Sequence, residues 1–283
     1  MKLSSNFSQN FLFERRLLAA LLVFVRDVGR GDKLEISAAT AIPTGKSSGK
    51  VEPMIGYAVA MGLIKSERGA GGVWVLQLTP LGEVVLQEDP YLSEPQTQWL
   101  LHLLLCRRAG LSSPPVGVAE SWFALFALGR YRLGKVFTLE AAQRYLIERI
   151  GAKSYVKRLT TVTLQSYLEP NSLKLAEAVR MTEAGYVWQA APSLDSYFPF
   201  YAVALDWVWE ELFASERQVA LQELERQSYL LTLLGWEESA QNRWLDWMVD
   251  RGIIQLDRQT GGALLLRLKQ GEALIRGLYQ EML

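Results

Sequence analysis

The first sixty residues show the apolar spacing of three consecutive helices. Apolar residues at intervals of three and four predict a helix over residues 11–28, which Gly29 ends. A shorter helix over residues 34–41 and a third over 49–61 follow, separated by a turn at residues 44–49. Hydroxyl side chains in this turn can cap the third helix. The three segments together predict a helix-turn-helix.

A β-hairpin pattern follows the third helix. Residues 63–64 begin a strand, the glycine-rich segment 68–72 is typical of a turn, and residues 73–78 alternate in polarity as a returning strand does. Trp74 lies on this strand, and we expect its side chain to pack beneath the hairpin rather than to stack on a base. Helices followed by a hairpin in this order predict a winged helix-turn-helix, an architecture of DNA-binding proteins.

The same pattern returns near the C-terminal end. Aligning Gly62 with Gly252 places Gly71 and Gly72 on Gly261 and Gly262 without a gap. The same offset matches Leu63 and Ile64 with Ile253 and Ile254, Leu76 with Leu266, and Leu78 with Leu268. After this point the second copy is shorter by one residue, and Gly82 and Glu83 then match Gly271 and Glu272. This register predicts two copies of one structural unit. The helix before the second hairpin is expected over residues 239–251.

The region between the two copies is mainly helical by the same criterion. Helices are expected over residues 91–106, 121–128, 137–150, 154–168 and 199–213. A short hairpin pattern at 179–189 raises a third, degenerate winged helix over about 120–189 as an alternative to a purely helical middle. The sequence therefore predicts a mainly α chain with small β-hairpins (α+β): tandem winged helix-turn-helix units at residues 1–90 and 214–283, joined by a helical middle region at 91–213.

The composition is that of a globular protein with more than one compact unit. The chain has 283 residues, of which 49% are apolar and 21% charged. Its formal net charge is zero, which argues against indiscriminate coating of nucleic acid through many Lys and Arg. The charge is uneven, however: residues 107–158 hold ten basic residues and three acids, and residues 161–225 hold three basic residues and ten acids. A local basic surface and a pair of solvated helix faces both fit this asymmetry.

The segment at residues 43–50 contains Gly-Lys-Ser, the end of a P-loop motif. A P-loop needs a glycine at position 40 and a buried strand before it, whereas position 40 is Thr and a helix is predicted there. We therefore interpret the segment as a helix-capping turn. Backbone N–H groups and cations at the start of a recognition-type helix can bind phosphate. The candidate DNA contacts here are Lys46, Ser47, Ser48 and Lys50.

A second set of candidate DNA contacts lies in the middle region. Lys153 and Lys157 share one helix face at four-residue spacing. Phosphate contact and a merely solvated face explain this set equally well. Its members are Arg130, Arg132, Lys135, Lys153, Lys157 and Arg158.

Residues for catalysis or metal binding are scarce. His102 is the only histidine and Cys106 the only cysteine, and both lie in one apolar helix, so we expect buried side chains rather than a nucleophile or a ligand set. The sequence predicts neither an enzyme nor a cofactor. Residues 1–13 lack a signal-peptide core, and the apolar stretch 17–25 is too short to span a bilayer. A cytoplasmic protein without membrane contact is expected.

Two sequence blocks carry a family resemblance. Residues 41–64 and 78–105 together resemble the bacterial domain-of-unknown-function family four-thousand-and-seven. The residues that fit its motifs are Gly45, Lys46, Tyr57, Gly62, Leu63, Ile64, Leu81, Gly82, Asp89, Pro90, Tyr91, Leu92, Pro95, Thr97, Trp99, Leu100, Leu101 and His102. The departures are Pro43, Ser47, Ser48 and Ala58, the last where the family has Trp. Beyond residue 110 the likeness is faint.

The resemblance implies a role in DNA sulfur modification or phage defence. It implies no enzymatic activity, and it implies as partner a sulfotransfer-type or other enzyme of the defence system. The leading hypothesis is therefore a DNA-binding accessory or regulatory protein that contacts double-stranded DNA through winged helices. Lys46 and Lys50 are expected to contribute about one unit of salt-dependence slope each. The alternative, favoured by the neutral charge and the acidic stretch, is a protein–protein scaffold without DNA contact.

Overall fold

The structure, a computed structural model, describes residues 3–258 and 262–280. It is mainly helical, with three small antiparallel sheets whose strand orders are β1-β3-β2, β4-β6-β5 and β7-β9-β8. In each sheet the last strand in the sequence is central, because it pairs both with a short strand that follows the first helix and with its hairpin partner. The expected α+β class is confirmed.

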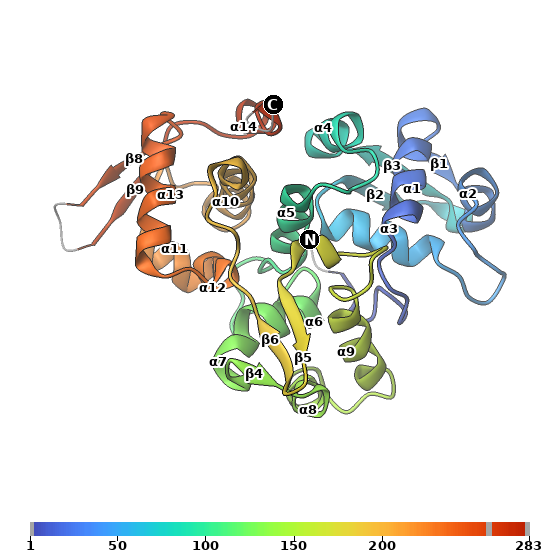
Figure 1. The fold of residues 1–283 in the computed structure, drawn as a ribbon. Helices are drawn as coiled ribbons and strands as arrows, with labels where there is room; N and C mark the ends of the chain where they lie inside the picture. Colours follow the sequence, from blue (N-terminus) through green and yellow to red (C-terminus); the bar gives the residue numbers. More distant parts are fainter. Residues whose placement is uncertain (1–2, 259–261, 281–283) are drawn as a thin grey trace.

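The first sheet belongs to the N-terminal part of the chain, on the right in Figure 1. Its elements are α1 (Arg15–Asp27), β1 (Arg30–Gly31), α2 (Lys33–Thr40), α3 (Val51–Ala60), β2 (Ile64–Arg68), β3 (Trp74–Leu78) and α4 (Pro80–Glu88). Asp32 caps α2 through a capping box with Glu35. The helices and the hairpin predicted here are present, and Gly-Lys-Ser lies in a turn after a helix rather than after a strand.

The second sheet lies in the middle region, at the bottom of Figure 1. Its elements are α6 (Glu120–Phe123), a π-helical turn (Ala124–Leu128), α7 (Gly129–Leu133), β4 (Val136–Phe137), α8 (Leu139–Ile150), α9 (Val156–Gln165), β5 (Val179–Thr182) and β6 (Gly185–Trp188). Thr138 caps α8 by accepting a hydrogen bond from the Ala141 amide. The hairpin expected at residues 179–189 is therefore present, and it pairs with β4.

The third sheet forms the C-terminal part, on the left in Figure 1. Its elements are α10 (Phe198–Phe213), β7 (Gln218–Ala220), α11 (Leu221–Ser228), α12 (Leu230–Leu234), α13 (Glu238–Asp250), β8 (Ile254–Asp257), β9 (Leu264–Arg267) and α14 (Glu272–Ile275). None of the helices among the described residues is long and apolar enough to cross a membrane.

The glycine register between the two hairpins corresponds to shared backbone geometry. Gly62 and Gly252 both have positive φ angles, 70° and 60°, a conformation that glycine adopts without steric cost. Strands β2 and β8 begin at matched positions, Ile64 and Ile254, as do β3 and β9. The pairing differs by one residue, because Ile64 pairs with Leu78 whereas Ile254 pairs with Arg267. Gly261, part of the predicted match, lies outside the described residues.

Two helices that are apolar on nearly every side hold the three parts together. In α5 (Pro95–Leu105) every residue from Thr97 onward is buried, and α10 is buried along most of its length. A helix without a polar face is stable only when other elements surround it. These two helices pack against each other at the centre of the molecule (Figure 1).

Candidate nucleic-acid interface

The turn before α3 presents one exposed cation, Lys46, and one of its hydroxyls, that of Thr44, caps the helix as expected. The Thr44 hydroxyl accepts a hydrogen bond from the Val51 amide at 3.1 Å. Lys46 is exposed at the tip of the turn, and its carbonyl oxygen accepts a hydrogen bond from the Lys33 ammonium at 2.6 Å. Ser47 and Ser48 are exposed but do not cap α3.

Lys50 is not available as a free phosphate contact. Its ammonium lies 2.5 Å from a carboxylate oxygen of Glu14 and above the ring of Phe11. Both side chains of the ion pair are about one-third exposed or less: 28% for Lys50 and 35% for Glu14. The positive charge of Lys50 is thus compensated within the protein.

Helix α3 cannot enter a DNA groove, which corrects the interpretation of residues 49–61 as a recognition helix. Nine of its ten residues are buried, and the remaining one, Glu52, is half-buried. Phe7 and Trp122 pack on its Tyr57 ring, and the Tyr57 hydroxyl donates to the Phe11 carbonyl at 2.9 Å. The N-terminal segment and the middle region therefore cover the face that a recognition helix would present.

Arg130, another of the expected DNA contacts, is held inside the protein. Its guanidinium donates to the carbonyl oxygens of Gln189 and Leu233, at 3.0 and 3.3 Å, and stacks over the ring of Trp188. Burial lowers its pKa to about 10, so it stays charged at neutral pH. Arg130 fastens the middle region to the C-terminal region instead of facing solvent.

Three further arginines of the basic stretch also make internal contacts. Arg107 pairs with Glu211 at 2.8 Å, and Arg149 pairs with Glu120 at 2.9 Å. Arg108 donates to Gln227 and to the carbonyl oxygen of Ser112. The sequence count of basic residues thus overstates the charge that this stretch offers to a partner.

In the basic stretch at residues 107–158 six cations remain exposed, and none of them forms an ion pair with a described residue. We call them the middle cations. They are Arg132, Lys135, Arg144, Lys153, Lys157 and Arg158. Five of the six are among the predicted contacts. Arg144 was missed as a site residue, although its place in a capped helix beside the other cations could have suggested it.

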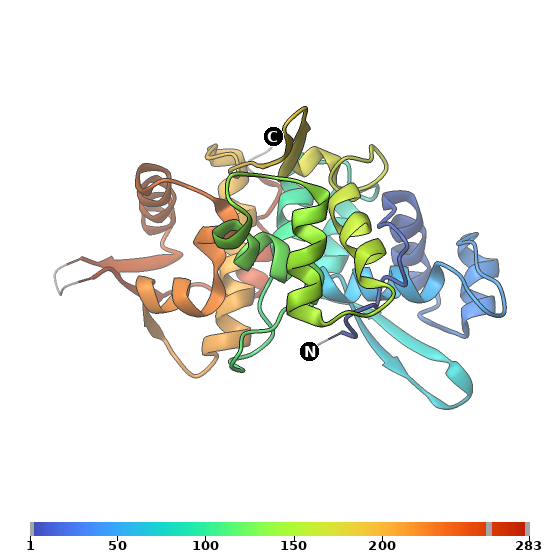
Figure 2. The same ribbon diagram turned by 90° about the horizontal axis from the view of Figure 1, so that it is seen from below.

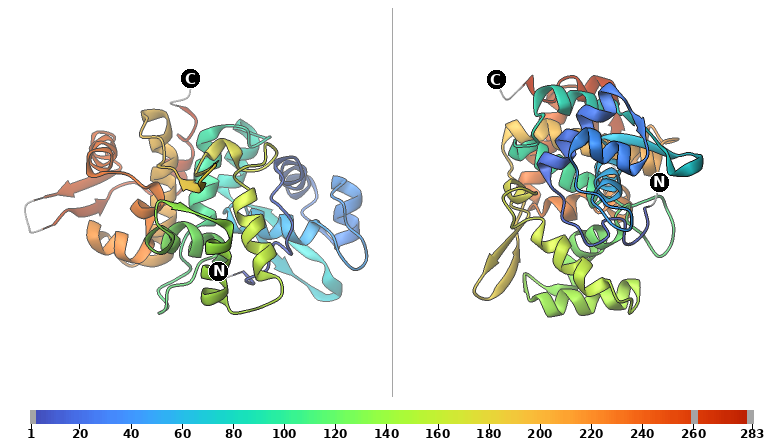
Figure 3. Two further views of the ribbon diagram at one scale, coloured as in Figure 1. Left: turned by 60° about the horizontal axis from the view of Figure 1, so that its bottom comes forward. Right: turned by 90° about the vertical axis from the view of Figure 1, so that its right-hand side faces the viewer.

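Three of the middle cations gather where α9 begins. Lys153 precedes the helix, and Lys157 and Arg158 lie in its first turn, which holds no acid and no side-chain cap. Cations at a helix N-terminus oppose the helix dipole, so they do not stabilise α9 itself. They add to the positive potential of the backbone N–H groups there, an arrangement that attracts anions. Helices α8 and α9 and the β5–β6 hairpin project from one side of the molecule (Figure 3, right), and α8 and α9 face the viewer in Figure 2.

The helix at the equivalent place in the C-terminal part has the opposite character. The exposed residues of α13 include three acids, Glu238, Asp246 and Asp250, of which Asp246 pairs with Arg258 at 2.8 Å. Its arginine, Arg243, pairs with Asp195 at 2.6 Å. Of the three helices that precede a hairpin in the described chain, α3 is buried, α13 is acidic, and α9 alone offers an exposed basic face.

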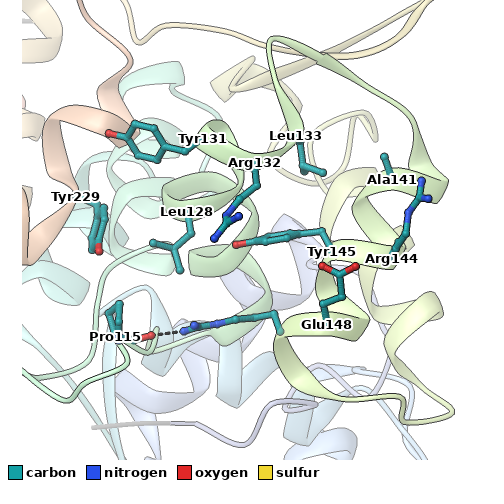
Figure 4. Close-up of a pocket in the computed structure, with 11 residues that line it drawn as sticks. Pro115, Leu128, Tyr131, Arg132, Leu133, Ala141, Arg144, Tyr145, Glu148 and Tyr229 are labelled. Atoms are coloured by element: carbon teal, nitrogen blue, oxygen red, sulfur yellow. Dashed lines mark hydrogen bonds between the residues drawn. The ribbon is translucent and has the colours of Figure 1, made fainter.

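A pocket of about 810 Å³ adjoins the middle cations on the far side of α8 from α9. Arg132, Arg144 and Arg149 line it together with the rings of Tyr131, Tyr145 and Tyr229, and Figure 4 shows the Arg132 guanidinium beside the hydroxyl of Tyr145. Burial raises the pKa of the Tyr145 phenol, so this group is neutral and can donate a hydrogen bond. Figure 4 also marks the hydrogen bond from Arg149 to the Pro115 carbonyl.

His102 and Cys106 form part of a closed core. The His102 Nδ1 lies 2.6 Å from the Tyr167 hydroxyl and 3.5 Å from the Cys106 sulfur, and all three side chains are buried. Burial lowers the pKa of His102 to about 3 and raises the pKa of the Cys106 thiol well above its ordinary value. A neutral imidazole without access to solvent packs the core. In the described part of the chain no three His, Cys, Asp or Glu side chains are placed to hold a metal ion.

The whole architecture recurs in two solved structures. They are described as "Magnesium ion-bound SspB crystal structure" and "SspB crystal structure", with TM-scores of 0.72 and 0.70. Each likeness covers 98% of this chain and 87% of the other, at 16% and 17% sequence identity. The similarity shows a shared fold. No family model and no curated protein sequence matches the chain.

Proposed function

We propose that the chain is a DNA-binding accessory protein of a bacterial defence or DNA sulfur-modification system. The system is suggested by the resemblance of residues 41–64 and 78–105 to a family associated with DNA phosphorothioation and phage defence. The shared fold with SspB over nearly the whole chain supports a common architecture. A sulfotransfer-type enzyme or another enzyme of the defence system is the proposed protein partner, with a regulatory rather than an enzymatic role for this chain in the cytoplasm.

The proposed architecture is three winged-helix units. Each unit has a helix, a short strand, two or more helices and a hairpin, and each sheet places its last strand at the centre. The units would span α1–β3, α6–β6 and α10–β9, so that α10 opens the third unit. In a helix-turn-helix the helix before the hairpin docks in the major groove, and in the middle unit that helix is α9.

The observation that carries the proposal is the exposed and unpaired set of cations at the start of α9. Lys153, Lys157 and Arg158 flank an N-terminus without an acidic residue. DNA phosphates would replace the missing counter-charge, and their neutralisation releases condensed cations. Because α9 exposes few other large polar groups, we expect binding to rest on the backbone and shape of the duplex rather than on base contacts.

Duplex binding by the purified chain tests the proposal. Fluorescence anisotropy of a labelled duplex of about 20 base pairs, titrated at physiological salt, should give saturable binding that weakens as salt increases. If the chain bound no duplex even at low salt, the proposal that it binds DNA would be wrong.

A scaffold role is the second candidate, and the acidic face of α13 favours it. Glu238 and Asp250 are exposed on α13 and would repel phosphate, but they fit a basic protein surface. A scaffold without DNA contact would bind no duplex in the same titration. Both roles are compatible if α9 binds DNA while α13 faces a protein.

A further inference from the structure

We infer that the pocket beside α8, lined by Arg132, Arg144 and Tyr131, binds one nucleotide of single-stranded DNA. This inference deepens the proposed function and rests on it, since it assigns an unstacked nucleotide to the side of α8 that faces away from α9, the helix proposed to meet the duplex. A volume of about 810 Å³ lies within the roughly 300–1,000 Å³ typical of small-ligand sites. The pocket is therefore of a size for one nucleotide and too small for a duplex.

The charges of the pocket fit a phosphate group. Arg132 and Arg144 are exposed, and neither has an ion-pair partner among the described residues. The third arginine, Arg149, pairs with Glu120 and donates to the Pro115 carbonyl, so its charge is compensated within the protein. Planar guanidinium groups bind phosphate with two parallel hydrogen bonds. The neutral Tyr145 phenol beside Arg132 adds a further donor (Figure 4).

The aromatic residues of the pocket fit a base. Tyr131 is 71% exposed, yet its hydroxyl is held at 2.6 Å from the Thr232 hydroxyl. An exposed ring in a fixed position costs little entropy when a base stacks on it. Glu148 supplies the acceptor that an N–H group of a base requires. Arginines alone would suit inorganic phosphate, whereas this combination suits a nucleotide.

The backbone at the rim shows local strain that the fold maintains. Tyr229 has a φ of 61°, which is uncommon for a bulky residue. Its ring packs edge-on against Phe123 at 5.6 Å, and its amide closes α11 by donating to Glu225 at 2.9 Å. This conformation places the Tyr229 ring at the pocket rim, facing residues of the middle region (Figure 4).

A short oligonucleotide and a free nucleotide distinguish the two possible sources of the ligand. Isothermal titration calorimetry of the full chain with 5′-phosphorylated tetrathymidylate and with thymidine monophosphate would measure both. We expect the tetranucleotide to bind at least tenfold more tightly, because neighbouring phosphates reach the other middle cations. Equal affinity for the two would overturn the assignment to a DNA strand, and no binding of either would overturn the pocket as a nucleotide site.

Three variants connect the binding to the pocket. Arg132→Ala with Arg144→Ala should weaken tetrathymidylate binding by at least tenfold, and Tyr131→Leu by about tenfold through lost stacking. Arg16→Ala, which removes an exposed arginine of α1 outside the pocket, is the matched control and should leave the affinity unchanged. Unchanged affinity in both pocket variants would overturn the inference.

Duplex binding keeps the two claims separate. If the chain binds duplex but no tetrathymidylate, the pocket inference fails and the proposed function stands. If it binds tetrathymidylate through the pocket but no duplex, the proposed function fails in its duplex contact and the nucleotide site stands.

Discussion

The side-chain amide of Gln143 donates a hydrogen bond to the carbonyl oxygen of Lys157 at 3.3 Å. This contact joins α8 to α9 at the first turn of α9, where Lys157 and Arg158 are exposed. The neighbouring residue on α8 is Arg144, which lines the pocket. The bond thus fixes the basic start of α9 relative to α8, the helix that lines the pocket.

Lys46 and Lys50, in the segment before α3, should contribute little to DNA binding. Lys50 is already paired with Glu14, and α3 is too deeply buried to approach a duplex. We therefore expect the Lys46→Ala/Lys50→Ala variant to keep the affinity and the salt-dependence slope of the parent chain, in contrast to the loss of about one unit per lysine that the sequence suggested. If anisotropy titrations showed a fall of about two units in the salt-dependence slope, the DNA interface would lie on the N-terminal unit.

The buried ion pair between Arg107 and Glu211 should be important for stability. Arg107 lies at the end of α5, Glu211 is on α10, and the two side chains are 8% and 16% exposed. Arg107→Met leaves a carboxylate buried near an apolar surface, and removal of one partner of such a pair costs about 3–5 kcal/mol. Urea unfolding should show this loss. Adding Glu211→Gln should recover part of it, and a double variant as unstable as the sum of the singles would contradict the pairing.

The pH dependence of stability should depend on His102. Burial, with a contribution from the charge of Arg130, lowers the pKa of His102 from 6.5 to about 3. The unfolded chain therefore takes up a proton below about pH 6.5 that the folded chain refuses until about pH 3, so the free energy of unfolding falls as the pH falls through this window. This residue should account for about 2 kcal/mol between pH 7 and pH 5.

His102→Phe provides the comparison. Its unfolding free energy at pH 7 can differ from that of the parent, but its change between pH 7 and pH 5 should be smaller by about 2 kcal/mol. Equal pH dependence in the two proteins would show that the imidazole titrates normally in the folded state.

The two equivalent glycines should differ in their tolerance of a side chain. Both have positive φ, which costs an alanine about 1 kcal/mol. At Gly62 a Cβ atom would also lie 2.7 Å from the Trp207 ring, whereas nothing lies within 4 Å at Gly252. Thermal unfolding should therefore show a larger loss for Gly62→Ala than for Gly252→Ala. Equal losses of stability in the two variants would show that the Trp207 side chain moves aside without an energetic cost.

The sequence predicts the long helices and the β2–β3 and β8–β9 hairpins because apolar residues recur in them at regular intervals. Thr138 and the glycines at 62 and 252 mark helix boundaries through local backbone chemistry. Strand β1 has only two residues, Arg30 and Gly31, too few for any alternation to be visible. Its existence depends on pairing with β3, which is a tertiary interaction.

The candidate site was predictable in its residue types but not in its exposure. The burial of α3 had a signal, since the helix is apolar on every side. Arg130 had none, because its partners are carbonyl oxygens of Gln189 and Leu233, far away in the sequence. Charge patterning locates cations along the chain, and only the folded structure shows which of them remain free.

The salt dependence of duplex binding by a variant of α9 tests the central claim most directly. The variant replaces Lys153, Lys157 and Arg158 with Ala, and its matched control replaces Arg16, Arg30 and Lys46, three exposed cations of the N-terminal unit. The slope of log K against log salt should fall by about three units in the α9 variant and remain unchanged in the control. An unchanged slope in the α9 variant, or an equal fall in both, would contradict DNA binding through the middle unit.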